Sequence, residues 1–294
     1  MSTLKELRSR IKSVKSTKKI TSAMKMVAAS KLKRAQDRVE AGRPYANHMA
    51  LLLSRLSVNL GGIDDIPKLI KGTGSTQKHF IVMLSSDRGL CGGFNTQLIR
   101  EMAVRVRQLE SEGKNIQIIC VGRKGGEAIK RLWPKYHNKT FQDIGKSGVT
   151  YKEAQLIANH ILRLFDDAEM DVCELLFNRF LNSMSSEPAY HQVVPVNAKF
   201  HDQPENAQAE RIYTYEPDPG TVLTNLLPRN LSEQIFTALL ESAASEHGAR
   251  MTAMDNATRN ADDMVKDLNL TYNTTRQAYI TRELVEIISG AEAV

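Results

Sequence analysis

The chain has 294 residues, of which 41% are hydrophobic and 25% charged, and its net charge is +7 at neutral pH. This composition is typical of a foldable chain, and the length predicts one or two domains. Windows of about 18 apolar residues are absent, so no membrane-spanning helix is expected. The first residues, MSTLKELRSRIKSVK, also lack the apolar run of a secretory signal.

Helix breakers are nearly absent from both ends of the chain. Residues 1–41 contain neither Gly nor Pro, and residues 229–289 contain only Gly248. Each stretch is far longer than an average globular helix of about 11–12 residues. Because isolated helices are marginal in water, we expect the two ends to pair as an antiparallel coiled coil with a compact domain inserted between them.

The charges of the two ends favour this pairing. Residues 1–60 hold 14 Lys and Arg against 3 Asp and Glu, whereas residues 229–294 hold 6 against 10. A basic helix beside an acidic one is electrostatically favourable. The remaining positive charge of the N-terminal helix is available to an acidic partner.

The N-terminal helix is expected to begin near Leu4. Gly42 and Pro44 predict a bend, after which helical character returns over residues 47–60. Residues 61–75 are interpreted as a loop. The apolar stripe at the start of this helix has helical spacing and comprises Leu4, Leu7, Ile11 and Val14.

Apolar strands and amphipathic helices alternate in the middle of the chain. This order predicts a small α/β (Rossmann-like) domain with a largely parallel sheet. The predicted strands are 79–84, 116–121, 172–180 and 192–196, and the predicted helices are 96–112, 124–133 and 150–167.

A linker with three prolines is expected at residues 202–220, and Pro228 is expected just before the final helix. We therefore predict coiled-coil helices at 1–60 and 222–294 and a central α/β domain at 76–200. The fold class is α/β with long terminal helices. Alanines at positions 249, 253, 257 and 261 of the final helix would allow close helix packing, although helix propensity also explains them.

Two glycine-containing turns follow predicted strands, where a phosphate-binding loop would lie. The glycines at 89, 92 and 93 fit neither GxGxxG nor GxxxxGK[ST], and those at 122, 125 and 126 do not fit either. Tight structural turns are therefore the favoured interpretation.

The cysteine and histidine spacings point to no metal centre. Cys91, Cys120 and Cys173 show no CxxC spacing, and the seven histidines show no HExxH pattern. We expect buried free thiols, no metal, no cofactor and no catalytic residue. Two alternatives stay open: a nucleotide-binding α/β protein with helical arms, and a basic coiled-coil adaptor for nucleic acid. The first predicts saturable nucleotide binding, and the second predicts binding with a steep salt dependence.

The last turns of the chain, ITRELVEIISGAEA at 280–293, resemble the terminal signature of the gamma subunit of F-type ATP synthases. Three further stretches are similar to the same family in family order. They are ITSAMKMVAASK at 20–31, SSDRGLCGGFN at 85–95 and YEPDP at 215–219. The resemblance therefore covers essentially the whole chain and is of the bacterial type.

This resemblance implies a non-catalytic rotor, present once per complex, whose paired helices penetrate a hexamer of alpha and beta subunits. The epsilon subunit and the membrane c-ring are the other implied partners. Proton flow through the ring would turn the chain, and ATP would be made in the beta subunits. The implied location is peripheral, at the cytoplasmic side of a bacterial inner membrane, with a mature mitochondrial form as the alternative. Neither nucleic acid binding nor a direct membrane span is implied.

The resemblance also implies contact residues on both terminal helices, facing the hexamer or each other. Arg276 and Gln277 would donate hydrogen bonds to a beta-subunit loop. Solvated coiled-coil faces are the alternative interpretation. The implied contact residues are Met24, Lys25, Arg276, Gln277, Thr281 and Glu283.

Overall fold

The computed structural model describes residues 3–58, 67–196, 216 and 218–292. The chain divides into two compact units, one of residues 1–29 with 250–294 and the other of residues 30–249. Helices α1 (Leu4–Val58) and α6 (Pro219–Glu292) contribute residues to both units. Each unit is described by itself below.

The larger unit contains a five-stranded sheet in the order β3-β2-β1-β4-β5. Strands β1 to β4 are parallel and β5 is antiparallel to β4. The strands are β1 (Lys78–Leu84), β2 (Asn115–Val121), β3 (His137–Phe141), β4 (Val172–Phe180) and β5 (Ser186–Val194). Strand β1 lies in the middle, and its apolar run FIVML is buried on both faces, as expected for a central parallel strand.

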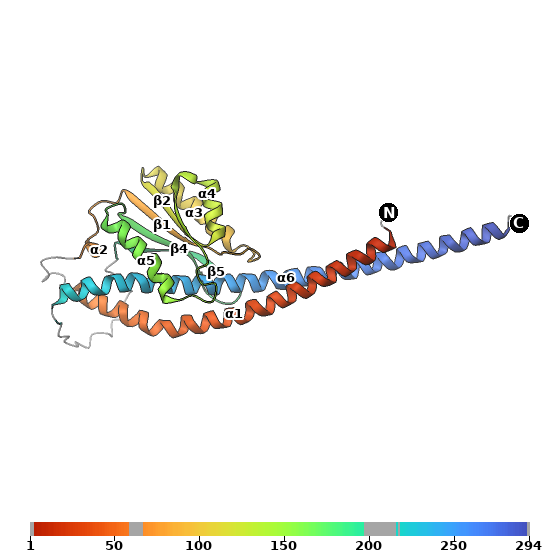
Figure 1. Cartoon of the computed structure of the whole chain (residues 1–294), viewed down its shortest axis with the longest axis horizontal. Coiled ribbons are helices and arrows are strands. Elements are labelled where there is room, and N and C mark those ends of the chain that lie inside the picture. Colours follow the sequence, from red (N-terminus) through yellow and green to blue (C-terminus); the bar gives the residue numbers. More distant parts are fainter. Residues whose placement is uncertain (1–2, 59–66, 197–215, 217, 293–294) are drawn as a thin grey trace. The chain divides into compact units, whose positions relative to one another are not determined.

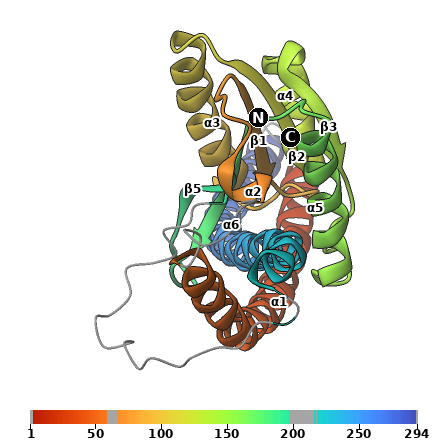
Figure 2. The ribbon, with the colours of Figure 1, turned by 90° about the vertical axis from the view of Figure 1, so that its left-hand side faces the viewer.

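Helices cover both faces of this sheet (Figures 1 and 2). On one face, Ile81 and Met83 of β1 pack in a cluster with α3 (Phe94–Ser111) and with Ile129 of α4 (Arg123–Leu132). On the other face, Phe80 and Val82 pack with α5 (Tyr151–Asp166) and with α6. Alternate residues of one strand therefore build two separate cores.

Helix α5 begins at a capping box formed by Thr150 and Glu153. The Glu153 carboxylate accepts a hydrogen bond from the Thr150 backbone amide at 2.8 Å. This pair satisfies groups that a helix end leaves unpaired and fixes where α5 starts.

In the smaller unit, residues 4–29 of α1 and 250–292 of α6 form an antiparallel pair (Figure 1). Small and aliphatic side chains are buried between them, among them Leu7, Ile11 and Ala28 on α1 and Met254 and Ala261 on α6. Among the described residues, no helix is both long enough and apolar enough to cross a membrane.

The predicted fold class, an α/β domain with an antiparallel pair of long terminal helices, is confirmed. Strands β1, β2 and β4 begin within one residue of the predicted positions. Strand β5 begins at Ser186, six residues earlier than predicted, and β3 was not predicted. The short helix α2 (Lys68–Lys71) lies within the predicted loop 61–75, of which residues 61–66 lie outside the described residues.

The helix boundaries predicted at two prolines are wrong, whereas the bend predicted at Gly42 and Pro44 stays a prediction. Helix α1 continues through Gly42 and Pro44, and α6 begins at Pro219 and contains Pro228. Near Pro228, Leu223 and Leu227 are at most 1% exposed, so apolar packing outweighs the cost of the missing backbone donor. Residues 202–215 and 217 of the predicted linker lie outside the described residues. The division into 1–60, 76–200 and 222–294 stays a prediction.

Candidate functional site

A ladder of polar pairs joins the two helices of the smaller unit. Lys18 Nζ lies 2.5 Å from Asp262 Oδ1, and Lys25 Nζ lies 2.5 Å from Asp255 Oδ1. The residue number rises by seven along α1 while it falls by seven along α6. This is the signature of an antiparallel pair in heptad register.

Between these two ion pairs, the Thr258 hydroxyl donates a hydrogen bond to the Thr21 hydroxyl at 2.8 Å. Thr21 is only 9% exposed, so the hydroxyl pair lies in the seam between the helices. Both hydroxyl protons are satisfied there, because Thr21 in turn donates to the Lys18 carbonyl at 3.1 Å. The seam is therefore polar at one point and apolar on either side, which penalises a shift of register.

The ion pairs change the acidity of their carboxyl groups. The hydrogen bond from Lys25 lowers the pKa of Asp255, and nearby Arg259 adds to this effect. The hydrogen bond from Lys18 lowers the pKa of Asp262. Because these side chains are partly exposed, the pairs contribute more to register than to stability.

The same register continues to Arg8, whose Nη2 donates to the Tyr272 hydroxyl at 2.8 Å. The Arg8 guanidinium also lies over the Tyr272 ring, 5.7 Å from its centroid. By this register Leu4, the first residue of α1, lies level with Arg276. Helix α6 continues from there to Glu292.

The final segment of α6, residues 277–292, therefore extends past the described start of α1. Every described side chain from Gln277 to Ser289 is exposed. Large apolar side chains are included, with Tyr279, Ile280, Leu284, Val285, Ile287 and Ile288 between 47% and 68% exposed. A lone helix with such a surface is typical of a segment that packs against another molecule.

The structure separates the predicted contact residues into two groups. Met24 is half-buried on α1, and its neighbour Lys25 pairs with Asp255. Arg276 and Gln277 on α6 are exposed, as are Thr281 and Glu283. In the described part of the chain, none of these four has a hydrogen bond or an ion pair to another side chain. The structure therefore does not bring the α1 residues to the α6 residues.

Sequence reasoning missed the register pairs themselves. Lys18 and Lys25 are seven residues apart on α1, and Asp255 and Asp262 are seven apart on α6. Equal spacing of opposite charges on two helices that were already expected to pair could have identified them.

The two glycine-containing turns of the larger unit are joined by hydrogen bonds. The backbone amide of Arg123 donates to Asp87 Oδ1 at 2.9 Å, and that of Gly125 donates to Ser85 Oγ at 3.0 Å. The amide of Lys124 donates to the Ser86 carbonyl at 3.0 Å. The amides that begin α4, which could bind a phosphate, are thus satisfied by the first turn. This supports the structural interpretation of both turns.

Helix α6 also covers the crevice where such sheets bind ligands. Open α/β sheets bind nucleotides at the carboxyl ends of the strands where the strand order reverses, here between β1 and β4. Ser242 of α6 donates to the carbonyl of Leu84 at the end of β1 at 3.4 Å, and Ser245 donates to the carbonyl of Asn178 in β4 at 2.9 Å. A nucleotide would have to displace α6, so the structure disfavours the nucleotide-binding alternative.

The three cysteines are buried thiols outside any disulfide, as predicted. Burial raises the pKa of Cys120 to about 12, and burial also raises the pKa of Cys173. Thiols that stay protonated are poor nucleophiles, which makes a redox role for these two cysteines unfavourable.

Comparison with known proteins agrees with this geometry. A family model for ATP synthase matches residues 3–294. The ATP synthase gamma chain of Rhodospirillum rubrum is 49% identical over 299 residues, and that of Acidiphilium cryptum is 50% identical over 296 residues. Both matches cover 100% of this chain and of the relative. The chain belongs to the ATP synthase gamma chain family.

Solved structures show the same fold. The central stalk/c-ring structure of the Tetrahymena thermophila mitochondrial ATP synthase contains a chain that is 27% identical, with a TM-score of 0.63, covering 81% of this chain and 99% of that one. A rotor chain of the Euglena gracilis mitochondrial ATP synthase has a TM-score of 0.67 at 18% identity, covering 94% of this chain and 98% of that one. At that identity the likeness concerns the fold.

Proposed function

We propose that this chain is the central-stalk rotor subunit of an F-type ATP synthase. It turns inside a hexamer of alpha and beta subunits and couples proton flow through the c-ring to ATP synthesis or hydrolysis in the beta subunits. The full-length match to gamma chains at about half identity carries the proposal. The heptad-registered helix pair and the exposed apolar end of α6 fit the role.

The chain itself performs no bond chemistry in this proposal. The loops at the carboxyl ends of β1 and β2 satisfy each other's polar groups, and α6 fills the crevice beside them. Catalysis then belongs to the beta subunits. A rotor acts on them only if it makes different contacts with their different conformations. An asymmetric helix pair, with one helix extending past the other, presents a different face to each position around it.

The partners are the alpha and beta subunits, the epsilon subunit and the c-ring, with one copy of this chain per complex. The location is the cytoplasmic side of a bacterial inner membrane, reached as a peripheral protein. Residues 1–60 and 222–294 are the coiled-coil segments in this proposal, and residues 76–200 are the central domain.

Rotation is the direct test. Ser147 is exposed in the larger unit and the native cysteines are buried, so Ser147→Cys gives one selective attachment point. A bead is attached there in the complex with alpha and beta subunits, and ATP is added. The threefold symmetry of the hexamer predicts one-way steps of about 120°. A complex that hydrolyses ATP without turning contradicts the proposal.

The contact residues have their own test. Arg276 and Gln277 would donate hydrogen bonds to a beta-subunit loop. The other implied contact residues would face the hexamer or each other, and they are Met24, Lys25, Thr281 and Glu283. Replacing Arg276 and Gln277 together by Ala should lower torque and ATP hydrolysis, because losing a hydrogen bond that involves a charged group costs about 1.5–3 kcal/mol. Thr274→Ala, at an exposed position on α6, is the matched control. Unchanged torque in the double variant would show that the assignment is wrong.

A further inference from the structure

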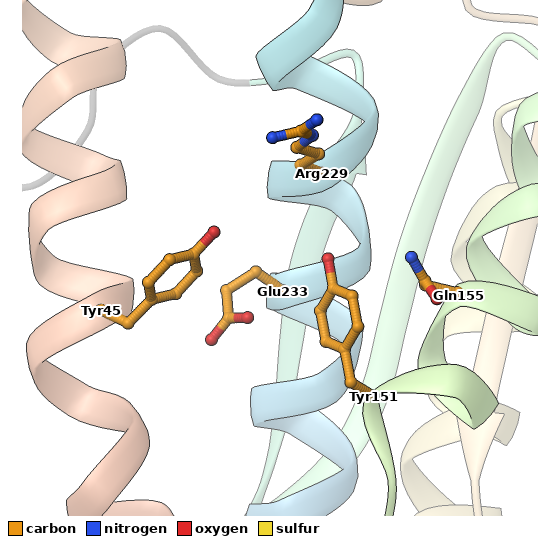
Figure 3. A pocket seen from close by; sticks show the side chains of 5 residues that line it. All are labelled: Tyr45, Tyr151, Gln155, Arg229 and Glu233. Carbon is orange, nitrogen blue, oxygen red and sulfur yellow. The ribbon is translucent and has the colours of Figure 1, made fainter.

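The larger unit contains a polar pocket of about 500 Å³ that none of the functions discussed above uses. Three helices line it, with Tyr45 from α1, Tyr151 and Gln155 from α5, and Arg229 and Glu233 from α6 (Figure 3). A pocket of this volume falls within the range that holds small organic molecules or a single large side chain.

Glu233 is the unusual group in this pocket. The residue is only 6% exposed, and its carboxylate has no hydrogen bond and no ion pair within the described ranges. Burial raises its pKa, and no neighbouring cation offsets this effect. Partial desolvation disfavours the ionised form of this carboxylate, so a cation placed beside Glu233 in the pocket would be favoured.

Arg229 lies one turn before Glu233 on α6 but does not neutralise it. A cation four residues before an anion is the less favourable orientation for a helical pair. In Figure 3 the Arg229 guanidinium lies toward the top of the view and the Glu233 carboxylate lies below it, and the two side chains point in different directions. The carboxylate therefore remains available to a cation from outside.

Two aromatic rings flank the Glu233 side chain. Figure 3 shows Tyr45 on one side of it and Tyr151 on the other. The Tyr151 ring is held by an edge contact with Phe236, at 5.8 Å between ring centroids and an interplanar angle of 77°. Aromatic faces attract ammonium and guanidinium groups, and this attraction adds to that of a carboxylate.

We propose that this pocket binds one organic cation, an ammonium or a guanidinium group, on the Glu233 carboxylate between the rings of Tyr45 and Tyr151. The cation has two possible sources, a free amine or the basic side chain of a neighbouring chain in the assembled complex. The chemistry of recognition is the same for both.

The test is calorimetric titration of the full chain with Nα-acetyl-lysine amide, which carries a single positive charge. We expect saturable binding of one molecule, and no binding of the neutral analogue Nα-acetyl-norleucine amide. Glu233→Gln should weaken binding about tenfold or more. Tyr45→Leu should weaken it about threefold, and because Tyr45 is 52% exposed its removal leaves the core intact.

Glu241→Gln is the matched control. Glu241 is also on α6, and burial also raises its pKa, but it does not line the pocket. Its variant should bind as the unaltered chain does. Absence of saturable binding by the unaltered chain, or equal binding by Glu233→Gln, overturns the proposal. If Glu233→Gln fails to fold, undiminished binding by Tyr45→Leu overturns it.

The same titration on the assembled complex distinguishes the sources. Retained binding assigns the pocket to a free amine. Blocked binding, together with carbodiimide coupling of Glu233 to a lysine of an adjacent subunit, assigns it to a neighbouring side chain.

Discussion

Replacing Arg105 should expose the energetic cost of a nearly buried carboxylate. Arg105 of α3 binds Glu174 of β4 through two contacts, of which Nε–Oε2 is 3.0 Å. The two side chains are 22% and 11% exposed. The Arg105 guanidinium also lies 6.0 Å from the centroid of the Tyr190 ring. Arg105→Met keeps much of the apolar stem and removes the charge.

The expected loss follows from the burial of Glu174. At this separation and an effective dielectric constant of about 20, the charges attract by about 5 kcal/mol. Desolvation of both ions offsets most of that gain, so the intact pair contributes little net stability. Removing Arg105 alone leaves the carboxylate desolvated, which typically costs about 3–5 kcal/mol. Because the Arg105 side chain still reaches solvent, we expect Arg105→Met to lower the free energy of unfolding by about 2–4 kcal/mol.

Urea unfolding followed by Trp133 fluorescence measures this loss. Trp133 is the single tryptophan of the chain, and it packs against the apolar cluster that includes α3. The matched control is Arg179→Met, because Arg179 forms a similar pair with Glu187 in which the side chains are 56% and 45% exposed. That exposed pair should contribute less than about 1 kcal/mol.

The double variant Arg105→Met with Glu174→Gln should recover most of the loss, because it removes the buried charge as well as its partner. Equal effects of Arg105→Met and Arg179→Met would refute the argument from burial. A double variant as unstable as the single one would show that lost packing, and not the lone charge, is the cause.

Three further predictions concern turns, caps and pH. Gly122 has φ +102°, and a Cβ there would lie 2.2 Å from the Ser85 carbonyl oxygen. Gly122→Ala should therefore lower the free energy of unfolding, measured by thermal denaturation, by about 3 kcal/mol. Gly89→Ala is the control, because a Cβ there meets open space and should change this free energy by less than about 0.5 kcal/mol. Thr150→Ala should cost about 1 kcal/mol by removing the α5 cap, and recovery by Thr150→Ser but not by Thr150→Val would identify the hydroxyl as the cause. Because the pKa values of Asp255 and Asp262 are lower in the folded chain than in the unfolded chain, their ion pairs stabilise the helix pair above the unfolded pKa and lose this effect as the pH falls through the folded values. The double variant Lys18→Met with Lys25→Met should therefore lose less helix content than the unaltered chain when the pH is lowered, as measured by circular dichroism. The same dependence of helix content on pH in both chains would count against these pairs.

Local pattern predicted the three buried strands well and the edge strand β3 not at all. The runs in β1, β2 and β4 are apolar because both faces of these strands are covered. Strand β3 has the sequence HNKTF and lies at the edge of the sheet, where charged residues such as Lys139 prevent pairing with other chains. Such a strand carries no periodic apolar signal, so sequence alone did not identify it.

The candidate sites depend on contacts that are distant in sequence. Ser242 binds a carbonyl 158 residues away, and Ser245 binds one 67 residues away. From the sequence alone, Glu233 is not distinguishable from other acidic residues on the predicted helix. Only the folded arrangement of α1, α5 and α6 shows that it is buried beside two tyrosines. The heptad pairs were accessible in principle, because both helices and their opposite charges had been predicted.

The hydroxyl bonds from α6 to the ends of β1 and β4 make the sheet and residues 219–249 of this helix one stiff piece. Ser242 and Ser245 hold two adjacent strands, and the Ser183 carbonyl lies against Gly248, where an added Cβ would approach it to 3.0 Å. Sliding the helix along the sheet would break both bonds at once. Torsional compliance between the sheet and this part of α6 should therefore be small, so that a marker fixed to the sheet would report the angular position of the helix with little elastic lag.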